Sequence, residues 1–167
     1  ENVLFLEAAR QLHMEMGTEN VQFVHVTYVP VLKSVGEAKT KPAQHSIKNL
    51  MNIGIIPDFL VCRSENPLDH VRMEKLALFC NVPKENIIVN CDLESIYDLP
   101  LVFDQQSFGE KILRNFELRP TENSLYVWQQ IAERFKTTEN KVRIVMVGKY
   151  VNIGDFTLAD SYVSVNE

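Results

Sequence analysis

The sequence predicts an α/β fold in which a mostly parallel sheet is covered by helices. Stretches rich in β-branched and aromatic residues alternate with stretches of helical periodicity, and the helices between them can supply the crossovers that parallel strands need. The chain has 167 residues, of which 46% are apolar and 23% charged, which is enough for one sizeable core. Ligands of such folds bind beyond the carboxyl ends of the strands.

The individual elements follow from local patterns along the chain. Phe5, Ala9 and Leu12 recur at spacings of four and three, which predicts a helix with Gly17 at its end. Residues 21–29 are mostly β-branched and aromatic and predict a buried strand. The same reasoning predicts helices at 2–16, 42–53, 70–80, 93–106, 107–116 and 124–136, and strands at 21–29, 59–62, 87–89 and 142–148.

Three residues are expected to mark helix boundaries in the middle of the chain. Pro100 should interrupt the helix over 93–106, because proline breaks a helix interior. Ser107 and Glu110 have the spacing of a capping box, which predicts that Ser107 caps the helix that follows. Asp92 could cap a helix that begins near Leu93.

Polar stretches indicate how the chain is divided. We expect a first domain over residues 1–116 and an interdomain linker with a helix over 117–141. Residues 142–167 would then begin a second α/β domain. Because the chain lacks an initiator Met and stops within an apparent helix, we expect a fragment of a longer protein.

Charge and cysteine content argue against several classes of protein. The net charge of −5 disfavours a general nucleic-acid binder. Cys62, Cys80 and Cys91 are odd in number and widely spaced, which disfavours a zinc site and fits free thiols in a reducing cytosol. The sequence has no signal-peptide pattern and no apolar run long enough to span a membrane, so we expect a cytoplasmic protein that binds neither nucleic acid nor membrane.

The most informative segment is Gly36–Ser46, GEAKTKPAQHS. Lys39 and Lys41 are two residues apart, so in an extended stretch both could face one anion. Pro42 suits the first turn of a helix, whose free N–H groups would add to anion binding. On spacing alone, a solvated basic loop is the alternative. The segment follows a predicted strand, as Arg63–Glu65 follows the next one, so both lie where a ligand is expected.

This part of the chain closely resembles the synthase domain of the CTP synthase family. Residues 36–65, GEAKTKPAQHSIKNLMNIGIIPDFLVCRSE, carry the motif G-E-x-K-T-K-P-T-Q-H/N-S-V and the strand that follows it in the family. The likeness continues in family order at 75–83, 92–97 and 147–150. Ala43 departs from the motif, because the family usually has Thr there and hence a hydroxyl able to bond a phosphate.

The resemblance implies a P-loop-type synthase domain, incomplete here, followed by the start of a glutamine amidotransferase domain. It implies a glutamine-hydrolysing C–N ligase of pyrimidine biosynthesis, a homotetramer that forms CTP from UTP with ATP and with ammonia from glutamine. Mg²⁺ would be bound mainly by residues outside this chain. The family's phosphate loop and Cys-His-Glu triad do not occur in this sequence, so we expect no catalytic residue in it and no activity from it alone.

Site residues are carried over position by position. Those that match UTP and CTP binding are Glu1, Lys39, Thr40, Lys41, Pro42, Ala43, Gln44 and Lys75, and those that match ATP binding are Cys91, Asp92 and Leu93. Glu1 is matched through the last residue of a G-D-I-E motif whose other residues are not in the chain. Without the resemblance, Lys75 and Gln44 would be read as solvated helix residues.

Two other classes of function stay open at this point. One is a nucleotide-binding or filament-forming pseudoenzyme related to CTP synthase, against which the intact lysines argue. The other is an unrelated α/β NTP-dependent ligase or kinase. Binding that is specific for a pyrimidine nucleotide would argue against the second class.

Overall fold

A three-stranded parallel sheet organises the larger of the two units into which the chain divides, residues 1–134 and residues 135–167. The computed structural model describes residues 2–32, 34, 36–120, 125–139, 142–149, 152–153, 156–157 and 162–166. The sheet has the order β1 (Val24–Tyr28), β4 (Phe59–Ser64) and β5 (Ile87–Cys91), and neighbouring strands are parallel. The α/β fold with a parallel sheet is therefore confirmed.

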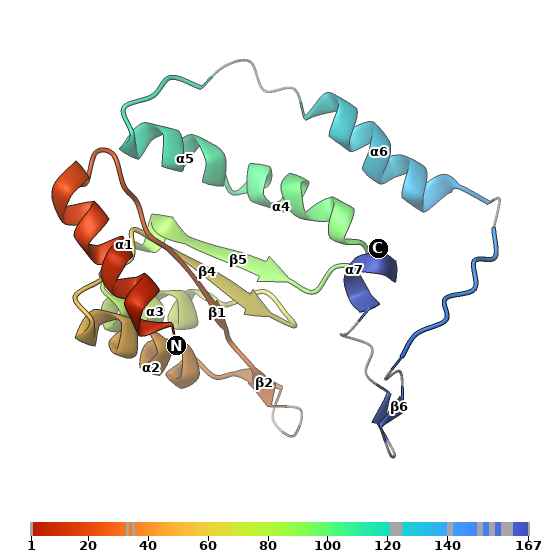
Figure 1. Cartoon of the computed structure of the whole chain (residues 1–167), viewed down its shortest axis with the longest axis horizontal. Helices are drawn as coiled ribbons and strands as arrows, with labels where there is room; N and C mark the ends of the chain where they lie inside the picture. The colour runs from red at the N-terminus through yellow and green to blue at the C-terminus, as the bar shows by residue number, and fades with distance from the viewer. Residues whose placement is uncertain are drawn as a thin grey trace. The chain divides into compact units, whose positions relative to one another are not determined.

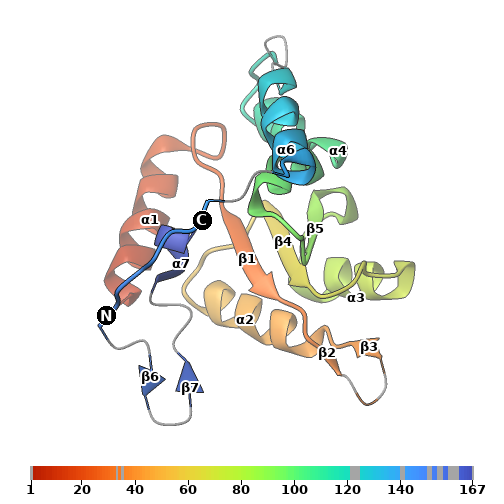
Figure 2. The same cartoon turned by 90° about the vertical axis from the view of Figure 1, so that its right-hand side faces the viewer.

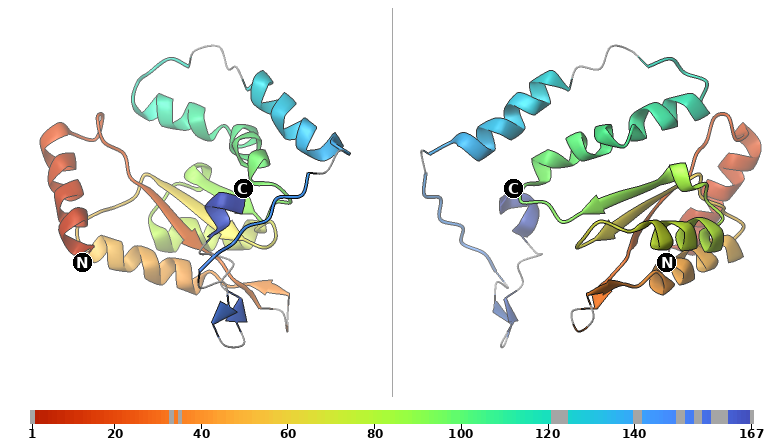
Figure 3. Two further views of the ribbon diagram at one scale, coloured as in Figure 1. Left: turned by 45° about the vertical axis from the view of Figure 1, so that its right-hand side comes forward. Right: turned by 180° about the vertical axis from the view of Figure 1, so that it is seen from behind.

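Helices cover the sheet on both faces (Figures 1 and 3). Helices α2 (Lys41–Asn52) and α3 (His70–Cys80) follow β1 and β4 and pack together on one face, where burial of their apolar sides forms the main core. The other face carries α4 (Leu99–Gln105) and α5 (Phe108–Asn115). The buried core cluster consists of Val29, Ala43, Ile47, Leu60, Cys62, Leu76, Cys80, Val82 and Ile87.

Aromatic rings and one amide fix the second helical layer. Phe108 meets Phe59 of β4 and Phe103 of α4 in edge-on contacts, with ring centroids 5.5 and 5.3 Å apart. The Gln106 side chain bonds both the N–H and the C=O of Val89, each at 2.9 Å. Because Val89 lies on the outer strand of the sheet, this amide satisfies backbone groups that a sheet edge would leave unpaired.

Shorter elements complete the first unit. Helix α1 (Val3–Met16) lies beside the β1 edge of the sheet, and a small antiparallel hairpin, β2 (Val31–Leu32) and β3 (Glu37–Ala38), leads from β1 into α2 (Figure 2). The remaining elements are the 3₁₀ turns η1 (Lys84–Asn86) and η2 (Ile96–Asp98) and helix α6 (Tyr126–Thr137), which runs past the unit boundary. No helix in the described ranges is long and apolar enough to cross a membrane.

The second unit differs from the expectation of a fresh strand. Residues 142–148 have no regular secondary structure, and Val142 and Val147 are 86% and 93% exposed. The predicted strand is wrong for this chain. A strand forms by pairing with a neighbour, and among the described residues no strand pairs with residues 142–148. The unit contains the hairpin β6 (Asn152–Ile153) and β7 (Phe156–Thr157) and the short helix α7 (Val163–Asn166).

Strand β1 is shorter and less buried than predicted. It spans 24–28 instead of 21–29, and the alternate side chains of Val24, Val26 and Tyr28 are 44–62% exposed. These three side chains share one face of the strand, since alternate residues point the same way. Composition predicted the strand correctly, but it could not show that β1 would lie at the edge of this sheet.

Two helix boundaries also correct the sequence predictions. The helix expected over 93–106 begins only at Leu99, and Pro100 lies in its first turn, where the missing N–H removes no helical bond. Ser107 has left-handed backbone angles (φ 52°, ψ 33°) and makes no side-chain cap, so the predicted capping box is wrong. A serine cap needs extended backbone angles, and the tight joint between α4 and α5 does not provide them.

Candidate functional site

The carboxyl ends of the three parallel strands carry the segments that the sequence singled out. β1 leads into residues 29–40, β4 into 65–69 and β5 into 92–95. In a parallel sheet these ends share one edge, which is the edge where ligands bind in open α/β sheets. The basic segment, residues 39–44, and the predicted ATP residues therefore follow strands that end at the same side of the sheet.

The basic segment forms the entry to α2. Lys39 precedes the helix, Lys41 is its first residue, and Pro42 follows in the first turn, as predicted. Thr40, between the two lysines, has helical backbone angles (φ −82°, ψ −14°). The expectation that the lysines lie in one extended stretch is therefore wrong, and each must reach a ligand from its own position.

Burial divides the side chains of this segment into two groups. Thr40 and Ala43 are 8% and 0% exposed, and Ala43 belongs to the core cluster. Gln44 donates from Nε2 to Thr40 Oγ1 at 3.0 Å. Lys41 and Pro42 are exposed. The lysines are thus the side chains best placed for an anion, and Ala43 packs the start of α2 against the core.

Lys39 takes part in a chain of alternating charges. Its Nζ lies 2.5 Å from Glu37 Oε2, and Glu37 Oε1 accepts a hydrogen bond from Arg72 Nη2 at 2.7 Å. Arg72 also contacts the carboxylate of Asp69, which caps α3 by accepting from the Arg72 backbone N–H at 2.9 Å. The bonds from Lys39 and then from Arg72 hold the pKa of Glu37 below its usual value, so this carboxyl is ionised at neutral pH.

Lys75 lies on the helix next to the basic segment. α3, which carries it, packs against α2, and the Lys75 side chain is exposed. Within the described ranges it forms no ion pair. The fold therefore carries Lys75 and the lysines at the start of α2 on adjacent helices.

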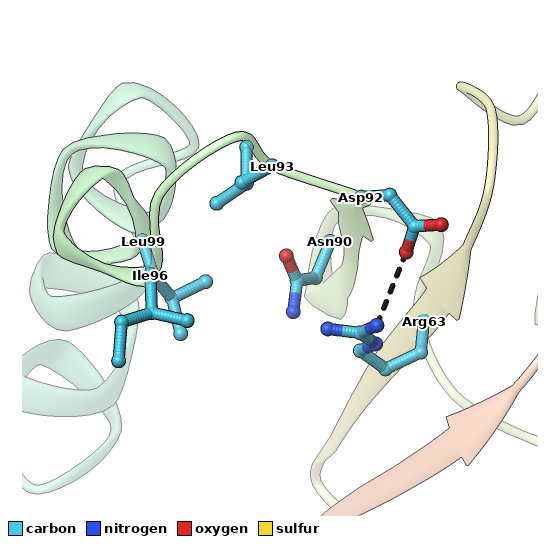
Figure 4. Close-up of a pocket in the computed structure, with 6 residues that line it drawn as sticks. All are labelled: Arg63, Asn90, Asp92, Leu93, Ile96 and Leu99. Atoms are coloured by element: carbon cyan, nitrogen blue, oxygen red, sulfur yellow. Dashed lines mark hydrogen bonds and ion pairs between the residues drawn. The ribbon is translucent and has the colours of Figure 1, made fainter. Parts of the chain in front are cut away.

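A pocket of about 420 Å³ lies beyond β4 and β5 (Figure 4). Leu93, Ile96 and Leu99 form its apolar side. Arg63 and Asp92 lie on the opposite side and are joined by an ion pair of 3.1 Å. Residues 93–95 are not helical, so Asp92 caps no helix near Leu93, and Ser95 caps the turn at Ile96–Asp98 by accepting from the Tyr97 N–H. The remaining lining residue, Asn90, lies between the two sides.

Asn90 is the most unusual group of this pocket. It is 5% exposed, and its Oδ1 has no hydrogen-bond partner among the described residues. Buried amide oxygens are nearly always bonded, so this one is available to a ligand donor. The strands place Asn90 and Arg63 side by side in register, which directs both toward one face of the sheet.

The cysteines are ordinary thiols in this fold. Cys62 and Cys80 are buried, as predicted, and burial raises their pKa to about 12 and about 11. Cys91, predicted to contact ATP, ends β5 and is partly exposed, and burial together with the nearby Asp92 raises its pKa as well. None of these three is poised as a nucleophile, since a reactive cysteine needs a lowered pKa.

Sequence reasoning missed part of this arrangement. It noted Arg63 after its strand and Glu37 within the basic motif but gave neither a role, and it did not consider Asn90 or Arg72. A polar residue at the end of an apolar strand could have drawn attention to Asn90. No local signal indicates the contact between Glu37 and Arg72, which are 35 residues apart in the sequence.

Two expectations cannot be assigned to described side chains. Glu1, matched to pyrimidine-nucleotide binding, lies outside the described residues. Among the residues that the structure describes, no group of three or more His, Cys, Asp or Glu could hold a metal ion. Binding of Mg²⁺ mainly by residues outside this chain stays a prediction.

Comparisons with known proteins agree with the resemblance read from the sequence. The family described as CTP synthase N-terminus matches residues 1–118. CTP synthase of Thermococcus gammatolerans is 47% identical over 167 residues, which is 100% of this chain and 30% of the relative. CTP synthases of Pyrococcus abyssi and of a Synechococcus species are each 46% identical over the same length, with the same shares covered. The chain thus spans about 30% of the length of these relatives.

Proposed function

Because the chain belongs to the CTP synthase family, we propose that it is part of a longer enzyme that forms CTP from UTP, using ATP and ammonia released from glutamine. Identity along the whole chain argues against an unrelated ligase or kinase. In this proposal residues 1–116 belong to the synthase domain, 117–141 link the domains, and 142–167 begin the glutamine amidotransferase domain.

One observation carries the proposal: a basic segment and a pocket follow strands that end at the same edge of a parallel sheet, and the pocket holds a buried amide oxygen without a partner among the described residues. An enzyme that transfers a phosphate from one nucleotide to another needs two such features close together. The basic segment suits a triphosphate, and the pocket suits a base, which is flat, largely apolar on its faces and polar on its rim.

UTP, and CTP as its product, would place the triphosphate against Lys39 and Lys41. Lys75, on the neighbouring helix, adds a third cation to this site in the proposal. The first backbone N–H groups of α2 would also donate to a phosphate, since the start of a helix favours negative charge. Pro42 and the bond from Gln44 to Thr40 shape this segment, and Ala43 holds it on the core.

ATP would place its adenine in the pocket beside Asp92 and Leu93. The side chains of Leu93, Ile96 and Leu99 offer an apolar wall for one face of the ring. The guanidinium of Arg63 can lie against the other face, as arginine does with aromatic rings. Asn90 can then bond the rim of the base.

In the reaction, the γ-phosphate of ATP is transferred to O4 of UTP, and ammonia displaces that phosphate to give CTP. The residues of this chain bind and orient the two nucleotides, which lowers the entropic cost of bringing them together. Mg²⁺, held mainly by residues outside this chain, would offset the charge of the phosphates. We further propose a cytoplasmic homotetramer whose nucleotide sites lie at subunit contacts.

Alanine substitutions of the two lysines test this function. In the longer protein, Lys39→Ala and Lys41→Ala should each weaken UTP and CTP binding by about ten- to a hundredfold, since each removes a charge-assisted contact to the shared triphosphate. Isothermal titration measures both affinities. Lys48→Ala, on the exposed side of the same helix, is the matched control and should bind both nucleotides normally. Unchanged UTP and CTP affinities in both test variants would reduce the segment to a solvated basic loop.

A further inference from the structure

The Glu37 carboxylate bridges two cations that come from different elements. One oxygen contacts the Lys39 ammonium at 2.5 Å, and the other accepts from the Arg72 guanidinium at 2.7 Å. Lys39 belongs to the basic segment, whereas Arg72 lies in the first turn of α3. Glu37 therefore ties the hairpin that precedes the basic segment to the neighbouring helix.

The two cations are held unequally. Arg72 contacts both Glu37 and Asp69, and its own backbone N–H bonds the Asp69 cap, so its position is fixed from two sides. Lys39 pairs with Glu37 alone within the described ranges, through a flexible stem. The Lys39 side chain is also more exposed than that of Arg72, at 38% against 25%. If one bond to Glu37 exchanges, it is the bond from Lys39.

When Lys39 leaves Glu37, the Glu37 carboxylate stays paired with Arg72. A carboxylate released beside an incoming polyanion would repel it, and that repulsion would oppose binding. With Arg72 still in place, the ionised carboxylate keeps an opposite charge at hydrogen-bond distance. The charge chain thus allows the ammonium to leave without uncovering a lone negative group.

We propose that Glu37 is a reversible holder for Lys39: the carboxylate and the nucleotide triphosphate compete for the Lys39 ammonium, and Arg72 retains Glu37 when Lys39 moves to the phosphates. Glu37 is a positioning residue in this account, since it touches Lys39 and not the nucleotide. The inference rests on the proposed role of Lys39 in binding UTP and CTP.

Glu37→Gln in the longer protein tests the competition, with CTP as the probe. The amide keeps the size of the side chain and removes its charge, so CTP should bind about two- to fivefold tighter, the range expected for losing one exposed ion pair. The same substitution in a Lys39→Ala background should leave CTP affinity unchanged, since the Glu37 carboxylate then has no Lys39 ammonium to hold. Arg72→Met should weaken CTP binding, because Glu37 is left with Lys39 as its partner.

Asp69→Asn controls for charge alone. It removes a carboxylate from the same charge chain without touching Lys39, and asparagine preserves the helix cap. Its effect on CTP affinity should be smaller than that of Glu37→Gln. Equal tightening by both variants, tightening by Glu37→Gln that persists without Lys39, or no tightening at all would each overturn the inference. Normal CTP affinity in Lys39→Ala would overturn the proposed role of Lys39 itself, and the inference with it.

Discussion

At the scale of single residues, Asn90 is a buried polar group whose described surroundings leave one atom without a hydrogen bond. Its carboxamide is nearly buried, it lines the pocket beyond β4 and β5, and its Oδ1 has no partner among the described residues. A buried polar atom without a partner costs roughly 1–3 kcal/mol. Such a residue destabilises the free protein, and in the proposed site a bound base would supply the missing hydrogen bond.

Asn90→Leu should therefore separate stability from binding. We expect a higher melting temperature without nucleotide, because the unsatisfied amide is gone, and ATP binding weakened by about tenfold, because one hydrogen bond to the base is lost. Differential scanning fluorimetry and equilibrium binding measure the two effects. Asn52→Leu, at the exposed end of α2, is the control and should leave both unchanged. Normal ATP binding by Asn90→Leu would mean that the base of ATP binds outside this pocket.

The sequence predicted the charged residues of the site better than their partners. Lys39 and Lys41 were found because a short motif carries them on one continuous segment. Glu37 lies in the same motif but was given no role, because its contact with Arg72 depends on how a hairpin packs against α3. Asn90 is polar in a strand, and only the structure shows that its Oδ1 has no partner among the residues described.

At the scale of elements, local patterns were sufficient wherever an element is amphipathic and packed. The helix predicted at 70–80 has those bounds, and the strand predicted at 59–62 begins at the observed residue. Prediction failed where pairing decides, as at 142–148, whose composition suits a strand but whose backbone remains irregular. It also failed at Ser107, where the joint between two helices sets the backbone angles.

Helix α2 holds the basic segment in place through its buried face. Ile47 is fully buried there, in the core cluster that also contains Ala43 and Leu60. Ile47→Ala should lower the free energy of unfolding by about 2–5 kcal/mol, since it leaves a cavity in a packed core. Denaturant unfolding measures this loss, and Lys48→Ala, one residue away and exposed, should stay within about 0.5 kcal/mol of the parent. If Ile47→Ala lowered the free energy of unfolding by less than about 0.5 kcal/mol, the buried face of α2 would not be what holds the basic segment in place.

At the scale of the whole molecule, the parallel sheet is what relates the two proposed nucleotide sites. β1 delivers the basic segment, β4 delivers Arg63, and β5 delivers Asn90 and Asp92, all at carboxyl ends. The family match covers residues 1–118, which include all of these residues. Glutamine hydrolysis and the assignment of 142–167 to a second domain stay predictions for the longer protein.

The most direct test is a structure of the longer protein, by electron cryomicroscopy, with UTP and a non-hydrolysable ATP analogue bound. We expect the UTP triphosphate within hydrogen-bond distance of Lys39 Nζ, with Lys39 released from Glu37 and the bond from Arg72 to Glu37 retained. We expect the adenine between Arg63 and the apolar wall of its pocket. A UTP triphosphate bound away from residues 39–44, with the Lys39–Glu37 pair intact, would contradict the central claim that this basic segment binds the pyrimidine nucleotide.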